Sequence, residues 1–449
     1  MHAALALAEY AAGVRGSALS QLVRGKVAQC VLDVLTAAVA GYNVPPVRAL
    51  RGVVQSLYGS GAAAVWFSGI TLAPAGAVFC NSAAASALDL DDGNRAARGH
   101  AGAAVIPTVL AFAAEVQASA EDVMAAIVAG YEVGVRVAAA RDAANAVSRQ
   151  SGRWSGYAAA AAAGRLRRTP PDKLAHALAI AGVTAPNQEA NGSSGYSKLT
   201  GNDVKEGIAW SATSGVVAVQ LAEAGLTGPL DILDHESHFA RAPLLDALGD
   251  TRATLKICDT YFKPYSCCRY NHAAIDAFAA LVRRHALTAR DIMAVDVHTF
   301  GWALKLGNKV EPLNLVDVQY SIPYCIGLTA IMGTESLLPV DERTLNRPDV
   351  SAFARKVKLH TDTTLDNRFP AETPARVVVC TANQRYESPV TTPLGEPSNP
   401  MSSEALQQKF LTVARGRLSA SMQEAVLRTV EQFAAGDAEP LLHRLMLRN

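Results

Sequence analysis

The stretch from Asp89 to Pro107 reads DLDDGNRAARGHAGAAVIP and places a charged segment between two Ala-rich apolar stretches. Its first twelve residues contain three carboxylates, two arginines and a histidine. The charges do not follow the 3.6-residue period of a helix surface, so they indicate a loop, and Pro107 suits the first turn of a following helix. A loop of acids, bases and cations is a common way to build a catalytic pocket, whereas a solvated turn with local ion pairs is the alternative.

The composition limits the classes of protein to which the chain can belong. Half of its 449 residues are hydrophobic and 18% are charged, which is enough for a substantial core and for two or three domains. The 41 basic and 40 acidic residues leave a net charge of +1, which argues against a dedicated binder of nucleic acid or acidic membranes. The seven cysteines include no CxxC pair, so neither a disulfide framework nor a zinc ribbon is predicted.

The N-terminal segment lacks the basic region of a signal peptide and is typical of a helix. The most apolar stretches, such as 101–114 and 155–163, are shorter than the roughly 20 residues that a membrane span needs. We therefore expect a soluble, cytoplasmic protein with no membrane partner and no nucleic-acid partner.

Residues 1–255 show mainly helical patterns. A helix start signal at Ser119 precedes apolar residues that repeat every four positions, namely Val123, Ile127, Tyr131 and Val135. Another helix is predicted to start near Thr169, and Gly207–Ala224 reads as a helix rich in small residues that ends before Gly225. Small residues let helices approach closely, so a tight helical bundle is expected.

Near Thr254 the pattern changes from helical to mixed. Alternating or β-branched runs predict strands at Leu255–Cys258, Val295–His298, Val357–His360 and Arg376–Cys380. Helices are expected at about 271–286 and 320–333, residues 394–400 resemble a linker, and helical patterning returns from Ser403. The predicted fold class is mostly α, with a large discontinuous all-helical domain (1–255 and 396–449) and a smaller inserted α+β domain (256–395).

Several kinds of cofactor chemistry are disfavoured by the motifs. The sequence has no Walker-type phosphate loop, no GxGxxG after a strand and no GxSxG elbow, and His235 and His238 have weak metal-ligand spacing. The remaining candidates are acid–base and cationic. Lys263 precedes a proline and therefore cannot lie in a helix interior; we expect it at a turn near the domain junction, where clefts form.

Other candidates have structural alternatives of similar weight. His272 precedes an apolar helix and is explained at least as well by capping or core packing as by base catalysis. Tyr320 or Tyr324 could donate a proton if nearby cations lower its pKa, while aromatic packing is the alternative. Lys205 begins the small-residue helix, where a surface lysine would be ordinary.

Four segments of the chain resemble the MmgE/PrpD family, namely Asp89–Pro107, Lys205–Gly228, Lys263–Ala277 and Tyr320–Tyr324. The family includes 2-methylcitrate dehydratase, cis-aconitate decarboxylase and iminodisuccinate epimerase. The resemblance covers nearly the whole chain in order, and its DxDD…H…P and KPYxCCRYxHxAIDA segments are the specific ones. It implies a helical domain with an inserted α+β lid, a homodimer, no cofactor and no metal, and a pocket between the two domains.

Carried over by position, the resemblance implies pocket residues and one histidine just outside them. The pocket residues are Asp89, His100, Lys205, Lys263 and Tyr324, and the neighbouring histidine is His272. The chain also departs from the family pattern in three places. Gly93 stands where the dehydratases and decarboxylases carry a threonine, 149–152 where they carry a histidine motif, and Cys268 where decarboxylases have a second histidine.

These departures leave a pocket rich in cations. The arginines expected to bind substrate beside Lys205 and Lys263 are Arg95, Arg98, Arg149, Arg153 and Arg269. Arginine binds carboxylates bidentately and stays protonated, so the set suits a substrate with several carboxylates, such as iminodisuccinate. Within the family the chain looks most like the epimerase. A hydro-lyase acting on a hydroxy di- or tricarboxylate such as 2-methylcitrate is the runner-up, and a non-catalytic polyanion-binding protein is the third hypothesis.

The expected chemistry is cofactor-independent proton exchange at a carbon α to a carboxylate and an amine. His100 is expected to be the base, because its pKa can lie near neutrality. Lys263 or Tyr324 would serve the opposite face of that carbon, and Asp89 would orient or polarise His100.

Overall fold

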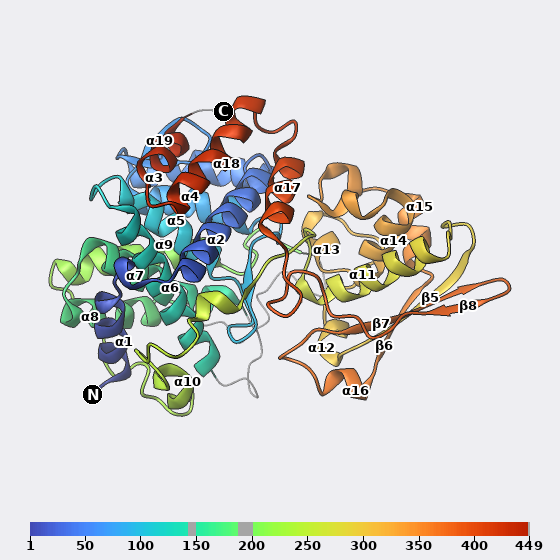
Figure 1. Ribbon diagram of the computed structural model, residues 1–449, viewed down its shortest axis with the longest axis horizontal. Helices are drawn as coiled ribbons and strands as arrows, with labels where there is room; N and C mark the ends of the chain where they lie inside the picture. The colour runs from blue at the N-terminus through green and yellow to red at the C-terminus, as the bar shows by residue number, and fades with distance from the viewer. Residues whose placement is uncertain (142–149, 187–200, 448–449) are drawn as a thin grey trace.

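The computed structural model describes residues 1–141, 150–186 and 201–447, and the chain is mostly helical with small β-sheets, as the sequence predicts. Figure 1 shows two lobes, one almost entirely helical and one in which helices lie against a sheet. Both chain termini lie on the helical lobe (Figure 1).

The helical lobe is built from two separate segments of the chain. Its helices are α1 (Ala3–Gly13), α2 (Gln21–Gly41), α3 (Pro45–Tyr58), α4 (Pro74–Ser86), α5 (Gly102–Ala113), α6 (Ala120–Ala140), α7 (Ser155–Arg167), α8 (Pro171–Val183), α9 (Ile208–Glu223), α10 (Arg241–Leu245), α17 (Ser403–Ala414), α18 (Ala420–Ala434) and α19 (Glu439–Met446). α7 packs against α5, α6, α8 and α9, while α17 and α18 pack on α2. The last fifty residues therefore complete a lobe that the first half of the chain begins.

Small residues allow the close packing of these helices, as the sequence suggests. α7 carries a run of six alanines from Ala158 to Ala163, all fully buried. A Cβ at Gly134 of α6 would lie 2.5 Å from Cβ of Ala158, so only glycine fits at this crossing. The predicted cap is also confirmed, because the hydroxyl of Ser119 accepts a hydrogen bond from the N–H of Asp122 at 3.1 Å.

The α6 helix has a length and composition that a membrane span would also have, which the sequence analysis did not single out. In its most apolar window 94% of the residues are buried inside the protein. The bent pair of α2 and α3 passes the same test of length and composition. Burial of this kind is typical of a core helix, because apolar residues on all sides of a helix need other protein around them.

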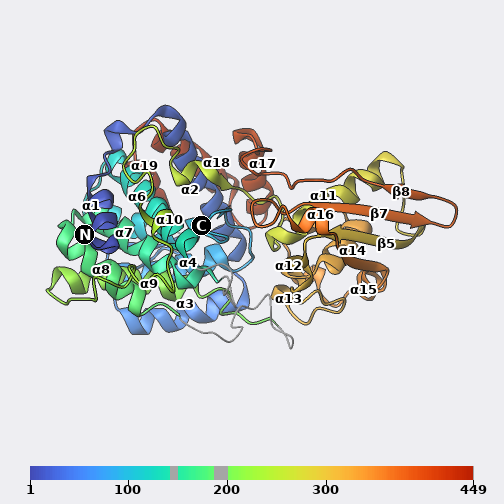
Figure 2. The same ribbon diagram turned by 90° about the horizontal axis from the view of Figure 1, so that it is seen from below.

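The α+β lobe contains a four-stranded sheet covered by helices. Its elements are α11 (Arg269–Arg284), β5 (Ile292–Thr299), α12 (Gly301–Leu304), α13 (Leu315–Gln319), α14 (Ile322–Met332), α15 (Pro348–Ala354), β6 (Val357–Thr361), α16 (Thr363–Asp366), β7 (Ala375–Thr381) and β8 (Arg385–Glu387). The strand order is β6-β5-β7-β8, with β5 and β6 parallel and the other pairs antiparallel. Figure 2 shows β7 and β8 extending away from the helical lobe. Three of the four predicted strands are thus confirmed.

The prediction of a fourth strand at Leu255–Cys258 is wrong. Residues Lys256–Asp259 form a 3₁₀ turn, and the strand β4 (Thr260–Tyr261) begins only after it. Alternation over four residues does not separate a strand from such a turn, because Ile257 is buried in either case. β4 pairs antiparallel with β3 (Gly93–Asn94), and a separate hairpin joins β1 (Ala63–Val65) to β2 (Ile70–Leu72).

The expected position of Pro107 at the start of a helix is also wrong, because Pro107 lies inside α5, which begins at Gly102. The carboxylate of Asp92 accepts a hydrogen bond from the N–H of Gly102 at 2.9 Å, and this acceptor at the first turn starts the helix earlier. The charged loop is therefore short and is held at both ends, by α4 and by α5.

Candidate functional site

The loop from Asp89 to His100 (the site loop) connects α4 to α5 and carries buried carboxylates. Asp89, Asp91 and Asp92 are all nearly inaccessible to solvent. Asp92 accepts hydrogen bonds from the N–H of Gly102 and from the hydroxyl of Tyr131, which tie the loop to α5 and α6. Burial and the charge of Asp33 raise the pKa of Asp92 to about 7. Asp92 thus holds the loop in place.

His100 is oriented by the backbone of this loop. Its Nδ1 lies 2.7 Å from the carbonyl oxygen of Asp92, a contact that places the proton of a neutral ring on Nδ1 and leaves Nε2 as the basic atom. Nε2 lies 3.6 Å from Oδ1 of Asp89, and Nδ1 lies 3.5 Å from Oδ2 of Asp91. Burial and the positive charge of Lys263 lower the pKa of His100. The negative charges of Asp91, Glu206 and Asp89 raise it by more, so the pKa is raised overall.

Lys263 and Asp89 form a buried ion pair. The Lys263 side chain is fully buried, and its Nζ lies 3.3 Å from Oδ1 of Asp89. Burial favours the neutral forms, but each charge stabilises the other, so the pKa of Asp89 is lowered and that of Lys263 is raised. The ammonium has three N–H donors, so those not directed at Asp89 are available for an anionic group brought into the site.

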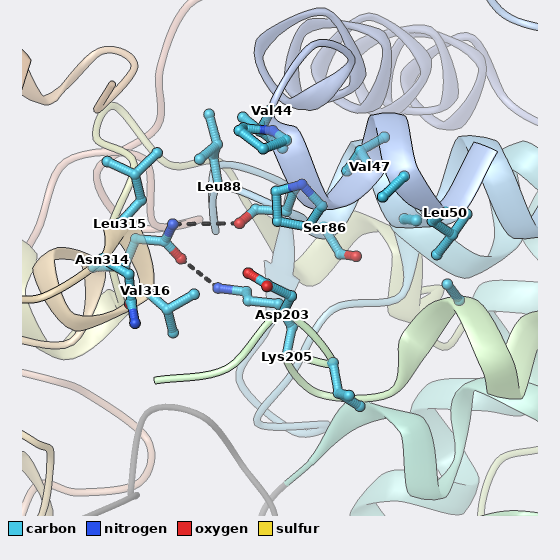
Figure 3. A pocket seen from close by; sticks show the side chains of 18 of the residues that line it. Val44, Val47, Leu50, Ser86, Leu88, Asp203, Lys205, Asn314, Leu315 and Val316 are labelled. Carbon is cyan, nitrogen blue, oxygen red and sulfur yellow. Dashed lines mark hydrogen bonds between the residues drawn. The ribbon is translucent and has the colours of Figure 1, made fainter. Parts of the chain in front are cut away.

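Lys205 lies in the turn before α9 and approaches Asp89, His100 and Lys263, here called the acid–base cluster. Its Nζ donates a hydrogen bond to Oε1 of Gln319, and Nε2 of Gln319 donates to the carbonyl of Ala87 at 3.3 Å (Figure 3). The ammonium also lies 4.9 Å from the ring centroid of Tyr320. Burial outweighs the attraction of Asp89 and Glu206 and lowers the pKa of Lys205. This lysine thus links the helical lobe to α13 of the α+β lobe.

Three site residues have a strained backbone conformation. Asp89, Arg98 and Lys205 have φ angles of 54°, 54° and 56°, in the left-handed region that residues with a Cβ rarely adopt. Such strain persists only where surrounding contacts enforce it, and it concentrates at functional sites.

A serine and a glutamate hold the other side of His100. The hydroxyl of Ser151 accepts a hydrogen bond from the His100 N–H at 3.1 Å and donates one to Glu206 at 2.6 Å. The Ser151 N–H also donates to Glu206, at 2.9 Å. Because Glu206 follows Lys205 in the chain, the hydrogen bonds of Ser151 connect His100 to the turn that carries Lys205.

Two of the predicted substrate-binding arginines are paired within the protein. Arg95 and Arg269 both form ion pairs with the carboxylate of Glu396, and Arg95 also donates to the hydroxyl of Thr373 at 2.7 Å. Glu396 belongs to the segment through which the chain returns from the α+β lobe. The structure thus places these two guanidinium groups on Glu396, where they tie that segment to the site loop and to α11.

Two other arginines lie near a third that the sequence did not single out. Burial and the charges of Arg153 and Arg98 lower the pKa of Arg141 to about 10, so the three arginines lie close enough to repel one another. Arg98 is two residues from His100 in sequence, and Arg153 is two residues from Ser151. The predicted residue Arg149 lies outside the described residues.

Tyr324 and His272 make contacts of a structural kind. The Tyr324 hydroxyl donates a hydrogen bond to the carbonyl of Thr344 at 2.7 Å, and burial raises its pKa. Nε2 of His272 lies 3.1 Å from the carbonyl of Cys267, and burial and the charge of Arg269 lower the pKa of His272 far below its usual value. These contacts favour the capping or core interpretation of His272.

The chain matches two domain models of one family. The MmgE/PrpD N-terminal domain matches residues 5–247, and the MmgE/PrpD C-terminal domain matches residues 265–434. The chain belongs to the MmgE/PrpD family. Members of the MmgE/PrpD family are enzymes, dehydratases among them, so this chain is expected to be an enzyme as well. No curated protein gives a significant match to the chain.

This MmgE/PrpD protein has a large cavity beside the cluster. Its volume is about 780 Å³, and it lies between α3, α4 and the start of α9 on one side and α13 on the other (Figure 3). The lining is largely apolar, and Lys205 and Gln319 supply polar groups at its wall. Of the predicted site residues that the structure describes, Lys205 is the one that lines this cavity.

The acid–base cluster of this MmgE/PrpD protein has ligand atoms that could surround a cation. Oxygen atoms of Asp89 and Asp91 and a nitrogen of His100 lie within 4.8 Å of one another. However, the ammonium of Lys263 already supplies a positive charge 3.3 Å from Asp89. A metal ion at this place would be repelled by Lys263, so the geometry favours proton transfer over metal binding.

Sequence reasoning missed several residues that the fold brings to this MmgE/PrpD site. They are Asp91, Arg141, Ser151, Glu206, Tyr261, Gln319 and Glu396. Asp91 and Glu206 were recognisable as carboxylates adjoining predicted site residues, and Tyr261 as a position two residues from Lys263. Gln319 likewise adjoins the candidate Tyr320, whereas Glu396 carried no such signal, because it reaches the site only through tertiary contacts.

Proposed function

We propose that this protein is a cofactor-independent epimerase that interconverts the stereoisomers of iminodisuccinate. The observation that carries the proposal is the arrangement of His100, with Nδ1 on a backbone carbonyl and Nε2 directed toward the buried Asp89–Lys263 pair. A base oriented in this way, beside fixed cations, suits removal of a proton from a carbon next to a carboxylate.

The cations of the site have a distinct role in this reaction. A substrate carboxylate bound by the Lys263 ammonium would have its charge neutralised. That neutralisation stabilises the enolate-like species formed when the α-proton leaves, and it is the largest expected contribution to catalysis. Arg98, which belongs to the site loop, and Arg153, which interacts electrostatically with Arg141 as Arg98 does, would hold the remaining carboxylates.

The α+β lobe would act as a lid over this site. It supplies Gln319, which bonds Lys205, and Arg269, which bonds Glu396. We therefore propose the domain limits 1–255, 256–395 and 396–449, with the middle segment as the lid. Because Lys263 lies where the chain enters that segment, lid position and charge at the site would be coupled.

Proton NMR in heavy water tests this function directly. Purified protein is incubated with one stereoisomer of iminodisuccinate, and we expect deuterium at the α-carbon, appearance of the other stereoisomers and no alkene signal. A parallel incubation with 2-methylcitrate tests the hydro-lyase, which the dehydratases of this family make the second candidate. An alkene signal from that hydroxy acid, formed as water is lost, with no exchange in iminodisuccinate, would establish the hydro-lyase instead. The absence of any change with either substrate class would refute both.

The pH dependence gives a second test, because His100 must be neutral to accept a proton. Its fraction in the neutral form rises with pH through its raised pKa, so kcat/KM should rise over a range above the ordinary histidine value. Asp91→Asn removes the largest of the charges that raise this pKa, so the rising limb should move to lower pH. Asp203→Asn, at an exposed residue of the cavity wall, is the control and should leave the limb in place. An unmoved limb in Asp91→Asn would contradict the assignment of His100 as the base.

A further inference from the structure

Tyr261 stands two residues before Lys263, in the β3–β4 pair, where it lies opposite Gly93 of the site loop. A Cβ at Gly93 would come within 2.3 Å of the Tyr261 hydroxyl oxygen, so this hydroxyl rests directly against the loop. The residue before Gly93 is Asp92, whose carbonyl oxygen lies 2.7 Å from His100. The Tyr261 hydroxyl thus lies against Gly93, and Nδ1 of His100 contacts Asp92, the neighbouring residue of the site loop.

Phe262, which stands between Tyr261 and Lys263, shows to which side of the chain the Tyr261 side chain points. The ring of Phe262 faces α2, where Nζ of Lys26 lies 4.3 Å from its centroid. Side chains alternate along an extended segment, so Tyr261 and Lys263 point to the opposite side. The Asp89 contact of Lys263 confirms that this side faces the site loop.

Three cations surround the Tyr261 side chain. The guanidinium carbons of Arg95 and Arg269 lie 5.0 and 4.7 Å from its ring centroid, and Lys263 is a further positive charge nearby. Burial outweighs these charges and raises the pKa of Tyr261, so the hydroxyl is protonated at neutral pH. It makes no hydrogen bond within the described residues. The three cations lower the cost of forming a phenolate at this buried position, so the hydroxyl can give its proton to a carbanion, which is a far stronger base.

We propose that Tyr261 is the acid of the epimerisation and delivers its hydroxyl proton to the face of the substrate α-carbon opposite His100. This inference rests on the function proposed above. The α C–H bond breaks and its proton passes to Nε2 of His100, which leaves an imidazolium and an enolate-like carbanion. The O–H bond of Tyr261 then breaks as the new C–H bond forms, which leaves a phenolate. Proton exchange with water, or the reverse reaction on the other isomer, restores both groups.

The test compares Tyr261→Phe with wild type in heavy water, following inversion and deuterium exchange separately. The variant keeps the ring between the two arginines and removes only the hydroxyl. Inversion should fall by about 10²- to 10⁴-fold, the usual contribution of an acid–base group, while His100 still exchanges the α-proton with retention. The matched control is Tyr265→Phe, whose hydroxyl donates to Asp276 at 2.8 Å and which should retain both activities.

Three outcomes would overturn the assignment of Tyr261. These are inversion at the wild-type rate in Tyr261→Phe, equal loss of inversion and exchange in that variant, or the selective loss of inversion in Tyr324→Phe instead. A wild-type protein that exchanges no deuterium into iminodisuccinate would refute the proposed function, which distinguishes the two failures.

A second variant moves the hydroxyl without removing it. In Gly93→Ala the new Cβ would overlap the Tyr261 hydroxyl, so the ring must shift. We expect inversion to fall while exchange with retention persists, as in Tyr261→Phe. Full inversion in Gly93→Ala would contradict the proposed position of the acid, and thermal unfolding of each variant shows whether the fold is retained.

Discussion

Replacing His100 with glutamine is expected to lower kcat for both proton exchange and inversion by about 10²- to 10⁴-fold, the usual contribution of a general base. Glutamine can still bond the carbonyl of Asp92, which holds His100 at 2.7 Å, but it cannot accept a proton near neutral pH. The loss should appear mainly in kcat, because Lys263 and Lys205 retain their charges and would still bind the substrate carboxylates. Initial rates by NMR and circular dichroism of the partner stereoisomers provide the measurement.

The comparison of exchange and inversion makes this prediction specific. His100→Gln should abolish exchange and inversion together, whereas the loss of Tyr261 should affect inversion alone. His100→Gln with activity within threefold of wild type would remove the histidine from the mechanism. A variant with lower activity and a lower unfolding temperature would instead point to a structural role for the hydrogen bonds that the His100 ring and backbone make.

Replacing Lys409 with methionine is expected to lower the free energy of unfolding by about 3–5 kcal/mol, the usual cost of leaving one buried charge without its partner. Nζ of Lys409 donates to Oδ1 of Asp33 at 2.6 Å and to the carbonyl of Leu90 at 3.1 Å. Both side chains are buried, and burial raises the pKa of Asp33 and lowers that of Lys409. Since Leu90 belongs to the site loop, kcat should fall as well. Urea unfolding followed by circular dichroism measures the stability change.

Two further variants separate charge from packing in this prediction. The double replacement Lys409→Met with Asp33→Leu removes both buried charges and should recover most of the lost stability, because apolar replacements of a buried pair are well tolerated. Arg343→Met breaks an exposed pair with Asp341 and should cost at most about 1 kcal/mol. A Lys409→Met variant as stable as Arg343→Met would show that the buried pair does not hold the helices together.

Patterns local in sequence predicted the elements of this fold well. The four-residue period after Ser119 identified a buried helix face, alternation identified β5 and β6, and a β-branched run identified β7. The errors occurred where a tertiary contact decides the local structure. α5 starts early because the Asp92 carboxylate binds its first N–H, and the expected strand at Leu255–Cys258 is a turn that leads into the β3–β4 pair.

The candidate site was predicted less completely than the fold. Asp89, His100 and Lys263 were recognised as chemically unusual residues, and the structure brings all three together. Which charged residues pair with each other could not be derived from the sequence. Arg95 and Glu396, for example, are 301 positions apart, and either could have faced a substrate. The different surroundings of Tyr320 and Tyr324 also depend on tertiary structure. The Lys205 ammonium lies over the ring of Tyr320, whereas the hydroxyl of Tyr324 donates to the carbonyl of Thr344.

The packing of α17 on α2 has a consequence for how the protein is made. Asp33 and Lys409 are separated by 376 positions, and the chain between them includes the entire α+β lobe. During synthesis on the ribosome, α2 therefore emerges long before α17 and α18, which cover it. Its apolar surface stays uncovered by these helices while the α+β lobe is synthesised. Nascent chains that stop before α17 would expose that surface and would be candidates for chaperone binding and aggregation.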